Sequence, residues 1–184
     1  MHKNKKTVPS GMRVALCGVL AALSASCMLM TFIPAGEYAL PALAGMLLVP
    51  AVIELGVGAG WMSFAAAALV TLILPVSVEP KLLFVLFFGY YPVLKATAES
   101  RFPRLVELAI KLASFNAAMI ASYSLLVFIF NFDMSVFEIA GISLPWLILL
   151  IGNAVFLVYD FALTRVITGY MAAIHPAVRK IFKL

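Results

Sequence analysis

Residues 12–33 read MRVALCGVLAALSASCMLMTFI, an apolar run in which Arg13, near its start, is the sole charged residue. A lipid hydrocarbon core of about 30 Å needs about 20 such residues in a helix that rises ~1.5 Å per residue. The run is followed by Pro34, Gly36 and Glu37, residue types that are typical of a turn. This stretch predicts a transmembrane helix and decides the class of the whole chain.

The composition extends this prediction to the full length. The 184 residues are 65% hydrophobic and 11% charged, and the mean hydropathy is +1.12. A water-soluble globule of this size needs more polar surface than these values supply. The formal charge is +5, and the Lys and Arg residues that cause this excess lie mainly near the chain ends and in one connection. This distribution is better explained by the orientation of a membrane protein than by nucleic-acid binding. We expect an all-α integral membrane protein with a single transmembrane domain over residues 1–184.

Charged residues, prolines and glycines divide the apolar sequence into six runs. Each run approaches the length needed to cross a bilayer as a helix. Gly56, Gly58 and Gly60 predict a tight turn between the second and third runs. Gly89 and Pro92 predict a kink in the fourth. The predicted spans are about 12–33, 40–54, 57–74, 82–95, 108–130 and 144–174.

The distribution of positive charge tests a six-span arrangement, because Lys and Arg in short connections stay on the cytoplasmic side. With the N-terminus inside, Lys81 is the sole cation placed outside. Both termini are therefore expected on the cytoplasmic side of a bacterial inner membrane. The cations expected inside are Lys3, Lys5, Lys6, Arg13, Lys95, Arg101, Arg104, Lys111, Arg165, Arg179, Lys180 and Lys183. The outer connections carry the acids Glu37, Glu79, Asp133 and Glu138.

Several enzyme classes lack their motifs in this sequence. It contains no phosphate-binding G-x-x-x-x-G-K-[ST] loop, no H-E-x-x-H, no Cys-x-x-Cys pair and no G-x-S-x-G elbow. Its two histidines, His2 and His175, lie near the chain ends, outside the predicted spans. We therefore expect no enzyme activity, metal site or cofactor, and any ATP hydrolysis that drives the protein must come from a partner.

Small residues on the first predicted span form a candidate contact face. At 100° per residue, Ala15, Gly18, Ala22 and Ala25 share one side of the helix, and Ala21 and Ala25 form an A-x-x-x-A pair. Such faces let a second helix approach closely in a membrane. Packing within the same bundle and docking against another membrane protein both remain open.

Polar residues at membrane depth are costly and are candidates for function. Asn116, Asn153, Tyr90 and Tyr91 fall near the middle of the last three predicted spans. They predict a shared polar cavity, with the alternative that the two asparagines bond to each other as structural links between helices. Asp160 is the acid well inside a predicted span, and pairing with Arg165 or Lys95 competes there with proton or ion coupling.

A ring of polar and aromatic residues at the expected outer side is a candidate entrance for a solute. Solvated connections and an interfacial Trp anchor are the alternative explanation. The mostly acidic character of these connections favours a cationic or zwitterionic solute. The candidates are Glu37, Tyr38, Glu79, Lys81, Asn131, Asp133 and Trp146.

Together these features resemble one transporter family. A basic N-terminus, the opening Arg13-Val14-Ala15-Leu16, the run from Leu20 to Ala25 (LAALSA), a Pro-containing turn and six spans within 184 residues resemble the substrate-binding S components of energy-coupling factor (ECF) transporters. The resemblance implies that the small-residue face of the first helix contacts a transmembrane coupling subunit. By this resemblance, Ala21 and Ala25 would contact the coupling subunit, and Ala15, Gly18 and Ala22 would lie near the same contact.

The resemblance further implies a vitamin or related small molecule as ligand, with two ATPase subunits as the energy source. The ligand would lie under the 34–40 connection and among the outer or middle parts of the last three spans. The sequence therefore predicts a membrane subunit that captures a small solute outside and releases it inside. The alternative is a six-span scaffold of the cell-shape and cell-wall machinery, whose helices bind other membrane proteins and no solute.

Overall fold

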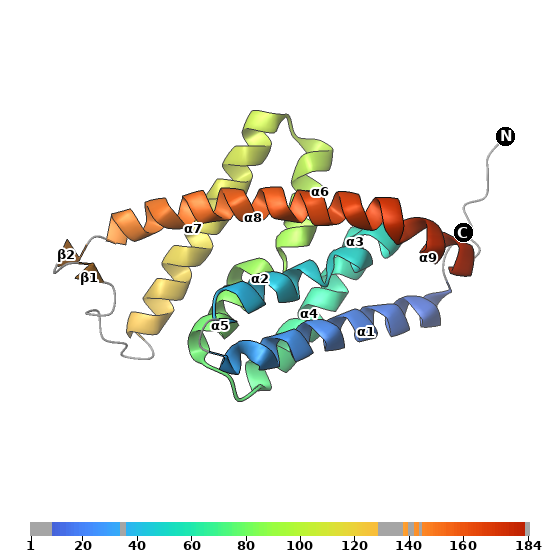
Figure 1. The fold of residues 1–184 in the computed structure, drawn as a ribbon, viewed down its shortest axis with the longest axis horizontal. Coiled ribbons are helices and arrows are strands. Elements are labelled where there is room, and N and C mark those ends of the chain that lie inside the picture. The colour runs from blue at the N-terminus through green and yellow to red at the C-terminus, as the bar shows by residue number, and fades with distance from the viewer. Residues whose placement is uncertain (1–8, 34–35, 129–137, 140–141, 144, 183–184) are drawn as a thin grey trace.

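The computed structural model describes residues 9–33, 36–128, 138–139, 142–143 and 145–182. These residues are helical apart from turns and one short antiparallel hairpin, in which Glu138 pairs with Ser143. Figure 1 shows the helices in chain order. The helices are α1 (Ser10–Leu29), α2 (Ala39–Met46), α3 (Val49–Leu55), α4 (Val57–Ile73), α5 (Val78–Leu83), α6 (Tyr91–Arg101), α7 (Arg104–Phe128), α8 (Pro145–Ala173) and α9 (His175–Phe182). A 3₁₀ turn (Met30–Phe32), a π-helical turn (Phe84–Phe88) and the strands β1 (Glu138–Ile139) and β2 (Ile142–Ser143) complete the described elements.

The described residues agree with the predicted all-α class and include helices that are candidates for membrane spans. Four helical segments among the described residues are long and apolar enough to cross a membrane. The second and third predicted spans correspond to shorter apolar helices, Ala39–Leu55 and Val57–Ile73. A helix of about 17 residues covers only about 25 Å of rise, slightly less than a typical hydrocarbon core. The four full-length segments are Ser10–Phe32, Val78–Arg101, Arg104–Phe128 and Leu149–Ala173.

One connection differs from its prediction. The polar stretch between Lys95 and Lys111 is helical on both sides of a break at Phe102 and Pro103. α6 therefore continues to Arg101, and α7 begins at Arg104. Charged side chains in this stretch extend the two helices, because Lys, Glu and Arg are good helix formers and pair at i,i+4 spacing.

Of the three glycines predicted to form a tight turn, Gly56 forms it, whereas Gly58 and Gly60 lie inside α4. Gly56 has φ of 89°, a left-handed value that side-chain-bearing residues rarely adopt. It ends α3 and starts α4 directly, so the two helices form a tight hairpin. The preceding span is broken at Leu47 and Leu48, and Pro50 lies in the first turn of α3.

The predicted kink in the fourth span is also present. Phe84–Phe88 form a π-helical turn, Gly89 and Tyr90 form a turn, and Pro92 lies in the first turn of α6. Gly45 of α2 packs against this bend so closely that a Cβ there would collide with the backbone carbonyl of Phe88. The bend therefore brings the backbones of two helical segments into direct contact.

Two buried clusters form the interior. The first joins α1, α2, α3 and α4 to the π-helical turn, and includes Met28, Leu48 and Phe84. The second joins the same turn to α6, α7 and α8, and includes Phe87, Phe115, Phe156 and Leu163. Many large apolar side chains remain on the surface, among them Leu69, Ile73, Leu105, Leu150 and Val158. Such a surface is suited to lipid rather than water.

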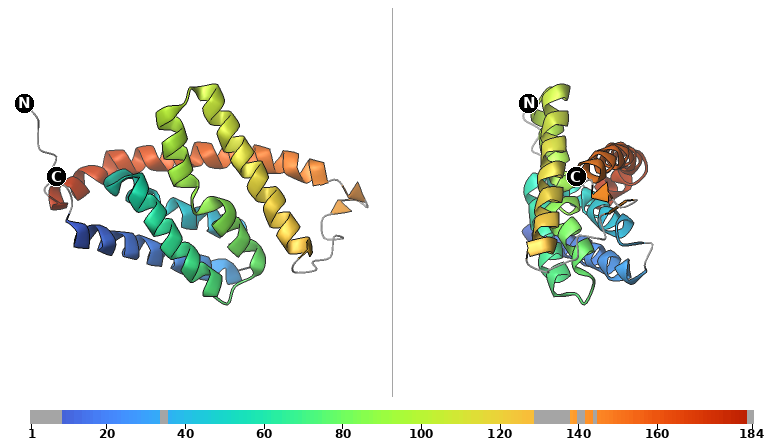
Figure 2. Two further views of the ribbon diagram at one scale, coloured as in Figure 1. Left: turned by 180° about the vertical axis from the view of Figure 1, so that it is seen from behind. Right: turned by 90° about the vertical axis from the view of Figure 1, so that its left-hand side faces the viewer.

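The helices place the two ends of the described chain together. Figures 1 and 2 show that α9 lies at the end of the molecule where α1 begins, and that β1 and β2 lie at the opposite end. The connection between α6 and α7 projects from the bundle in the same views. α8 runs along the length of the molecule and contacts α7.

Candidate functional site

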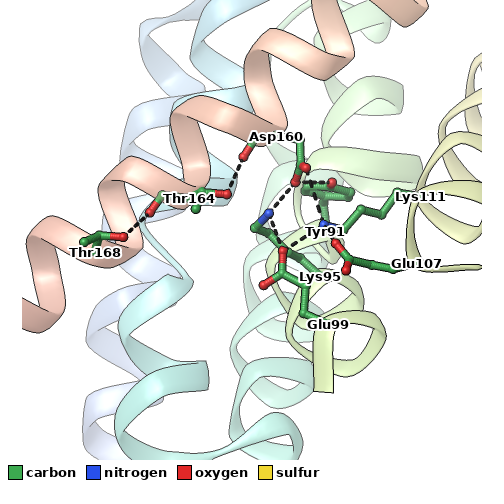
Figure 3. A network of polar contacts seen from close by, with 8 residues as sticks. All are labelled: Tyr91, Lys95, Glu99, Glu107, Lys111, Asp160, Thr164 and Thr168. Atoms are coloured by element: carbon green, nitrogen blue, oxygen red, sulfur yellow. Dashed lines mark hydrogen bonds and ion pairs between the residues drawn. The ribbon is translucent and has the colours of Figure 1, made fainter. Parts of the chain in front are cut away.

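A network of charged side chains lies at the junction of α6, α7 and α8 (Figure 3). Asp160 Oδ1 accepts a hydrogen bond of 2.7 Å from the Tyr91 hydroxyl and one of 2.5 Å from Lys95 Nζ. Asp160 Oδ2 lies 3.4 Å from Lys111 Nζ. Lys95 and Lys111 are each 1% exposed. The network therefore holds two ammonium groups away from solvent, where an unpaired charge is strongly unfavourable.

Two further carboxylates complete this network. Glu99 Oε1 lies 2.6 Å from Lys95 Nζ and 2.8 Å from Lys111 Nζ, and Glu107 Oε1 lies 2.5 Å from Lys111 Nζ. Three carboxylates thus face two lysines, which gives a formal charge of −1. We call this group the α6–α8 charge network; its members are Tyr91, Lys95, Glu99, Glu107, Lys111 and Asp160.

Helical spacing explains how these side chains meet. Tyr91, Lys95 and Glu99 follow one another at intervals of four on α6, and Glu107 and Lys111 do so on α7. Residues four apart lie on one face of a helix. Asp160 arrives from α8 and joins both faces, so the network ties three helices together.

The geometry resolves the two pairings considered for Asp160. Pairing with Lys95 is confirmed. Arg165 instead is exposed, with its guanidinium carbon 4.9 Å from the centroid of the Phe161 ring. The i,i+4 spacing of Glu107 and Lys111 could have indicated an ion pair between them. No spacing in the sequence could have indicated that Lys111 also contacts Asp160 of α8.

The two asparagines, each partly buried, bond to each other. Asn116 Nδ2 donates to Asn153 Oδ1 at 2.9 Å, and Asn153 Nδ2 donates to Asn116 Oδ1 at the same distance. Each amide also donates to the carbonyl four residues earlier, Leu112 or Leu149, at 2.8 Å. Both hydrogens of each amide are therefore engaged. In this conformation the asparagines therefore bond to each other and link α7 to α8, as the alternative to a shared polar cavity predicted.

The two tyrosines predicted at the same level have different partners. Tyr91 belongs to the charge network, whereas the Tyr90 hydroxyl lies 3.0 Å from Ser114 Oγ on α7. The Tyr90 ring stacks on Trp61 of α4, with centroids 6.1 Å apart. Tyr90 therefore joins the two halves of the bundle, and its partner Ser114 lies two positions before Asn116 on α7.

The structure brings together three of the candidates for an outer entrance. Glu37 and Tyr38 precede α2, and Glu79 lies in the first turn of α5. Partial burial raises the pKa of the Tyr38 phenol, and the nearby carboxylates of Glu79 and Glu37 raise it further. Lys81 Nζ lies 3.4 Å from the Leu72 carbonyl oxygen, at the end of α4.

Some predicted site residues receive no geometry here. Asn131 and Asp133 lie outside the described residues. Trp146 lies in α8 near its start, but its side chain is outside the described part.

Four of the five predicted docking residues of α1, all except Ala15, line an open groove of about 370 Å³ between α1 and α4. Ala21 and Ala25 are each 5% exposed, and Ala21 packs into the first buried cluster. Gly18 and Ala22 are exposed at the groove, and Ala15 is exposed nearer the start of α1. One small-residue face thus divides into an inner edge that packs within the bundle and an outer edge that is open.

A second buried acid was not predicted from sequence. The Glu54 side chain is 3% exposed, and its Oε1 lies 2.8 Å from His175 Nδ1 and 2.9 Å from the Tyr170 hydroxyl. His175, expected outside the apolar core, is half-buried against this carboxylate. The residues are distant in sequence, so no local spacing indicates the contact.

No family model, curated protein or solved structure matches the chain. Within the described ranges, no three His, Cys, Asp or Glu side chains are grouped so as to hold a metal ion. Function is therefore inferred from the residues and their arrangement.

Proposed function

We propose that this protein is the solute-binding subunit of a membrane importer of the ECF type. In this proposal the six apolar segments cross a bacterial inner membrane, with both termini in the cytoplasm. The subunit captures a vitamin-like small molecule outside. A transmembrane coupling subunit and two ATPase subunits provide the energy for release inside.

The observation that carries the proposal is the α6–α8 charge network. Ionisable groups within membrane helices are expensive and mark solute or ion pathways. Here they lie toward the proposed cytoplasmic ends of three helices, where Lys95 and Lys111 are buried by Asp160, Glu99 and Glu107. Such a network closes the inner end of a solute pathway between α6, α7 and α8.

The same network supplies a bistable element for release. Its contacts join α8 to the α6–α7 pair through one carboxylate, Asp160. Separating α8 from the pair breaks the contacts of Asp160 together while leaving the bonds of Glu99 and Glu107 within α6 and α7. A partner that pulls α8 away therefore opens the inner end in one cooperative step.

The proposed solute position lies on the outer side of this seal. Asn116 and Asn153 link α7 and α8, and Tyr90, in the turn before α6, contacts Ser114 of α7. In this proposal both contacts lie on the outer side of the network. A polar solute that exchanges hydrogen bonds with these amides would replace their mutual bonds. Glu37 and Glu79 at the outer end favour a cationic or zwitterionic solute.

The open groove between α1 and α4 is the proposed contact for the coupling subunit. Gly18 and Ala22 are exposed there beside apolar surface from Val70. Small residues let a partner helix approach closely, and van der Waals packing drives such association in lipid. The position away from the charge network leaves α8 free to move.

Affinity purification from native membranes tests the proposal. A tagged chain, solubilised in mild detergent, should retain a transmembrane partner and two ATPase subunits. Purification with cell-wall synthesis proteins, and without an ATPase, would support the scaffold and contradict the importer.

A further inference from the structure

The last described helix, α9, differs in pattern from the helices before it. It follows the end of the last candidate span at Ala173 and is eight residues long. At 100° per residue, positions 177, 178, 181 and 182 (Ala, Val, Ile and Phe) share one side, and Arg179 and Lys180 lie on the other. Arg179 and Lys180 are both exposed. This separation of apolar and basic residues is typical of a helix that lies in a membrane interface.

The start of α9 is fixed against the bundle. His175 Nδ1 lies 2.8 Å from Glu54 Oε1 at the end of α3, and the Tyr170 hydroxyl donates to the same oxygen at 2.9 Å. Arg13 Nη2 lies 3.4 Å from the Leu55 carbonyl, which brings the start of α1 to the same place. These contacts fix the position of the start of α9, which lies at the end of the molecule where α1 begins (Figure 1).

Three described cations at this end, Arg13, Arg179 and Lys180, are exposed. Among the described residues, the ion pairs involve Lys95, Lys111 and His175, and none involves Arg13, Arg179 or Lys180. The acid at this junction, Glu54, is buried and already holds two partners. The exposed charge is therefore positive, which complements an anionic surface.

We propose that α9 lies along the cytoplasmic membrane surface and binds anionic phospholipid headgroups through Arg179 and Lys180. Ala177 and Val178 face the acyl boundary, and the Glu54 contact holds the helix at that level. This inference rests on the membrane placement proposed above but not on solute uptake. Each basic residue near an anionic surface raises lipid binding about fivefold, so the pair gives a preference on the order of thirtyfold.

Tryptophan quenching by brominated lipids tests this in the full-length protein. Ala177→Trp, in a Trp61→Phe and Trp146→Phe background, places the reporter on α9. Reconstitution uses phosphatidylcholine bilayers that contain a small fraction of brominated phosphatidylglycerol or, for comparison, brominated phosphatidylcholine. We expect quenching by both lipids, with a relative association constant for phosphatidylglycerol on the order of thirtyfold above that for phosphatidylcholine.

Matched variants identify the residues responsible. Arg179→Gln with Lys180→Gln should reduce the preference to near unity, whereas Lys81→Gln, on the proposed outer side, should leave it unchanged. Equal quenching by the two lipids in the parent, no quenching at all, or a preference that survives the double substitution would overturn the inference. In a separate Trp146→Phe variant, quenching of Trp61, which is 47% exposed on α4, reports bilayer insertion, so a failure of membrane placement is distinguished from a failure of lipid recognition.

Discussion

Lys95 and Asp160 are 65 positions apart in the chain, yet their side chains meet at 2.5 Å in the interior of the bundle. The contact joins α6 to α8, and Lys111 extends it to α7. The charge network therefore holds α6, α7 and α8 together at one place. In the proposed importer, this point must open for a solute to leave.

The excess negative charge of the α6–α8 network predicts an asymmetry between two substitutions. Asp160→Asn removes one of three carboxylates and balances the two lysines, so it should lower the free energy of unfolding by about 1 kcal/mol or less. Lys95→Met leaves three carboxylates with one lysine and should cost about 3–5 kcal/mol. Unfolding by denaturant titration in detergent measures both.

Arg165→Gln is the control for that comparison, because Arg165 is exposed and lies outside the network. It should change the free energy of unfolding by less than about 0.5 kcal/mol. Equal losses for Lys95→Met and Asp160→Asn would mean that the network is not buried as described.

The asparagine pair predicts partial compensation in a double variant. Asn116→Leu or Asn153→Leu alone leaves one amide without its partner and should cost about 1–2 kcal/mol, whereas changing both should cost less than the sum of the two. The same single variants should weaken solute binding while the protein still inserts. If solute affinity is the same in both single variants as in the native protein, the pair is structural and lies outside the binding site.

The close approach of α2 to the π-helical turn predicts a strong effect at Gly45. Gly45→Ala places a Cβ against the Phe88 carbonyl and should destabilise the protein by about 1–3 kcal/mol. Gly58, in the first turn of α4, has no atom within 4 Å of the equivalent Cβ position. Gly58→Ala should therefore be neutral or stabilising. Similar melting temperatures for the two variants would contradict the packing at the bend.

Two neighbouring alanines on α1 separate internal packing from docking. Ala21→Leu overfills the first buried cluster and should destabilise the isolated subunit by about 1–3 kcal/mol. Ala22→Leu fills the open groove and should leave the melting temperature unchanged, but it should greatly reduce copurification of the coupling subunit. Retention of the partner by Ala22→Leu would place the docking surface elsewhere.

Single cysteines test the proposed orientation. In a Cys17→Ser, Cys27→Ser background, Phe102→Cys and Ser77→Cys place thiols at two exposed positions. A membrane-impermeant maleimide added to intact spheroplasts should label position 77 and not position 102. Labelling of position 102 would reverse the orientation and remove the proposed inner seal.

Patterns with a local cause could be predicted from the sequence. The six apolar runs appear as helical segments, because long runs without charge favour helices in any apolar surrounding, although the fourth extends beyond its predicted bounds, from Val78 to Arg101. The turn at Gly56 and the bend at Gly89–Pro92 could also be predicted, because one or two residues determine each of them.

Features that depend on tertiary contact could not be predicted. The sequence offers Lys95 as a possible partner of Asp160, but charged residues usually indicate surface, so it does not predict that partners from three helices bury Lys95 and Lys111. The contact of Glu54 with His175 joins residues from α3 and α9. The different exposures of Ala21 and Ala22 depend on where α2 and α4 pack, which the small-residue pattern alone does not specify.

Native mass spectrometry of the gently purified subunit tests the central claim most directly. The account predicts a reproducible small-molecule adduct bound one to one, cationic or zwitterionic, whose occupancy falls in the Asn153→Leu variant. A subunit that remains free of adduct when isolated from cells and after incubation with a metabolite extract, while melting at the temperature of a folded protein, would contradict a role in solute capture.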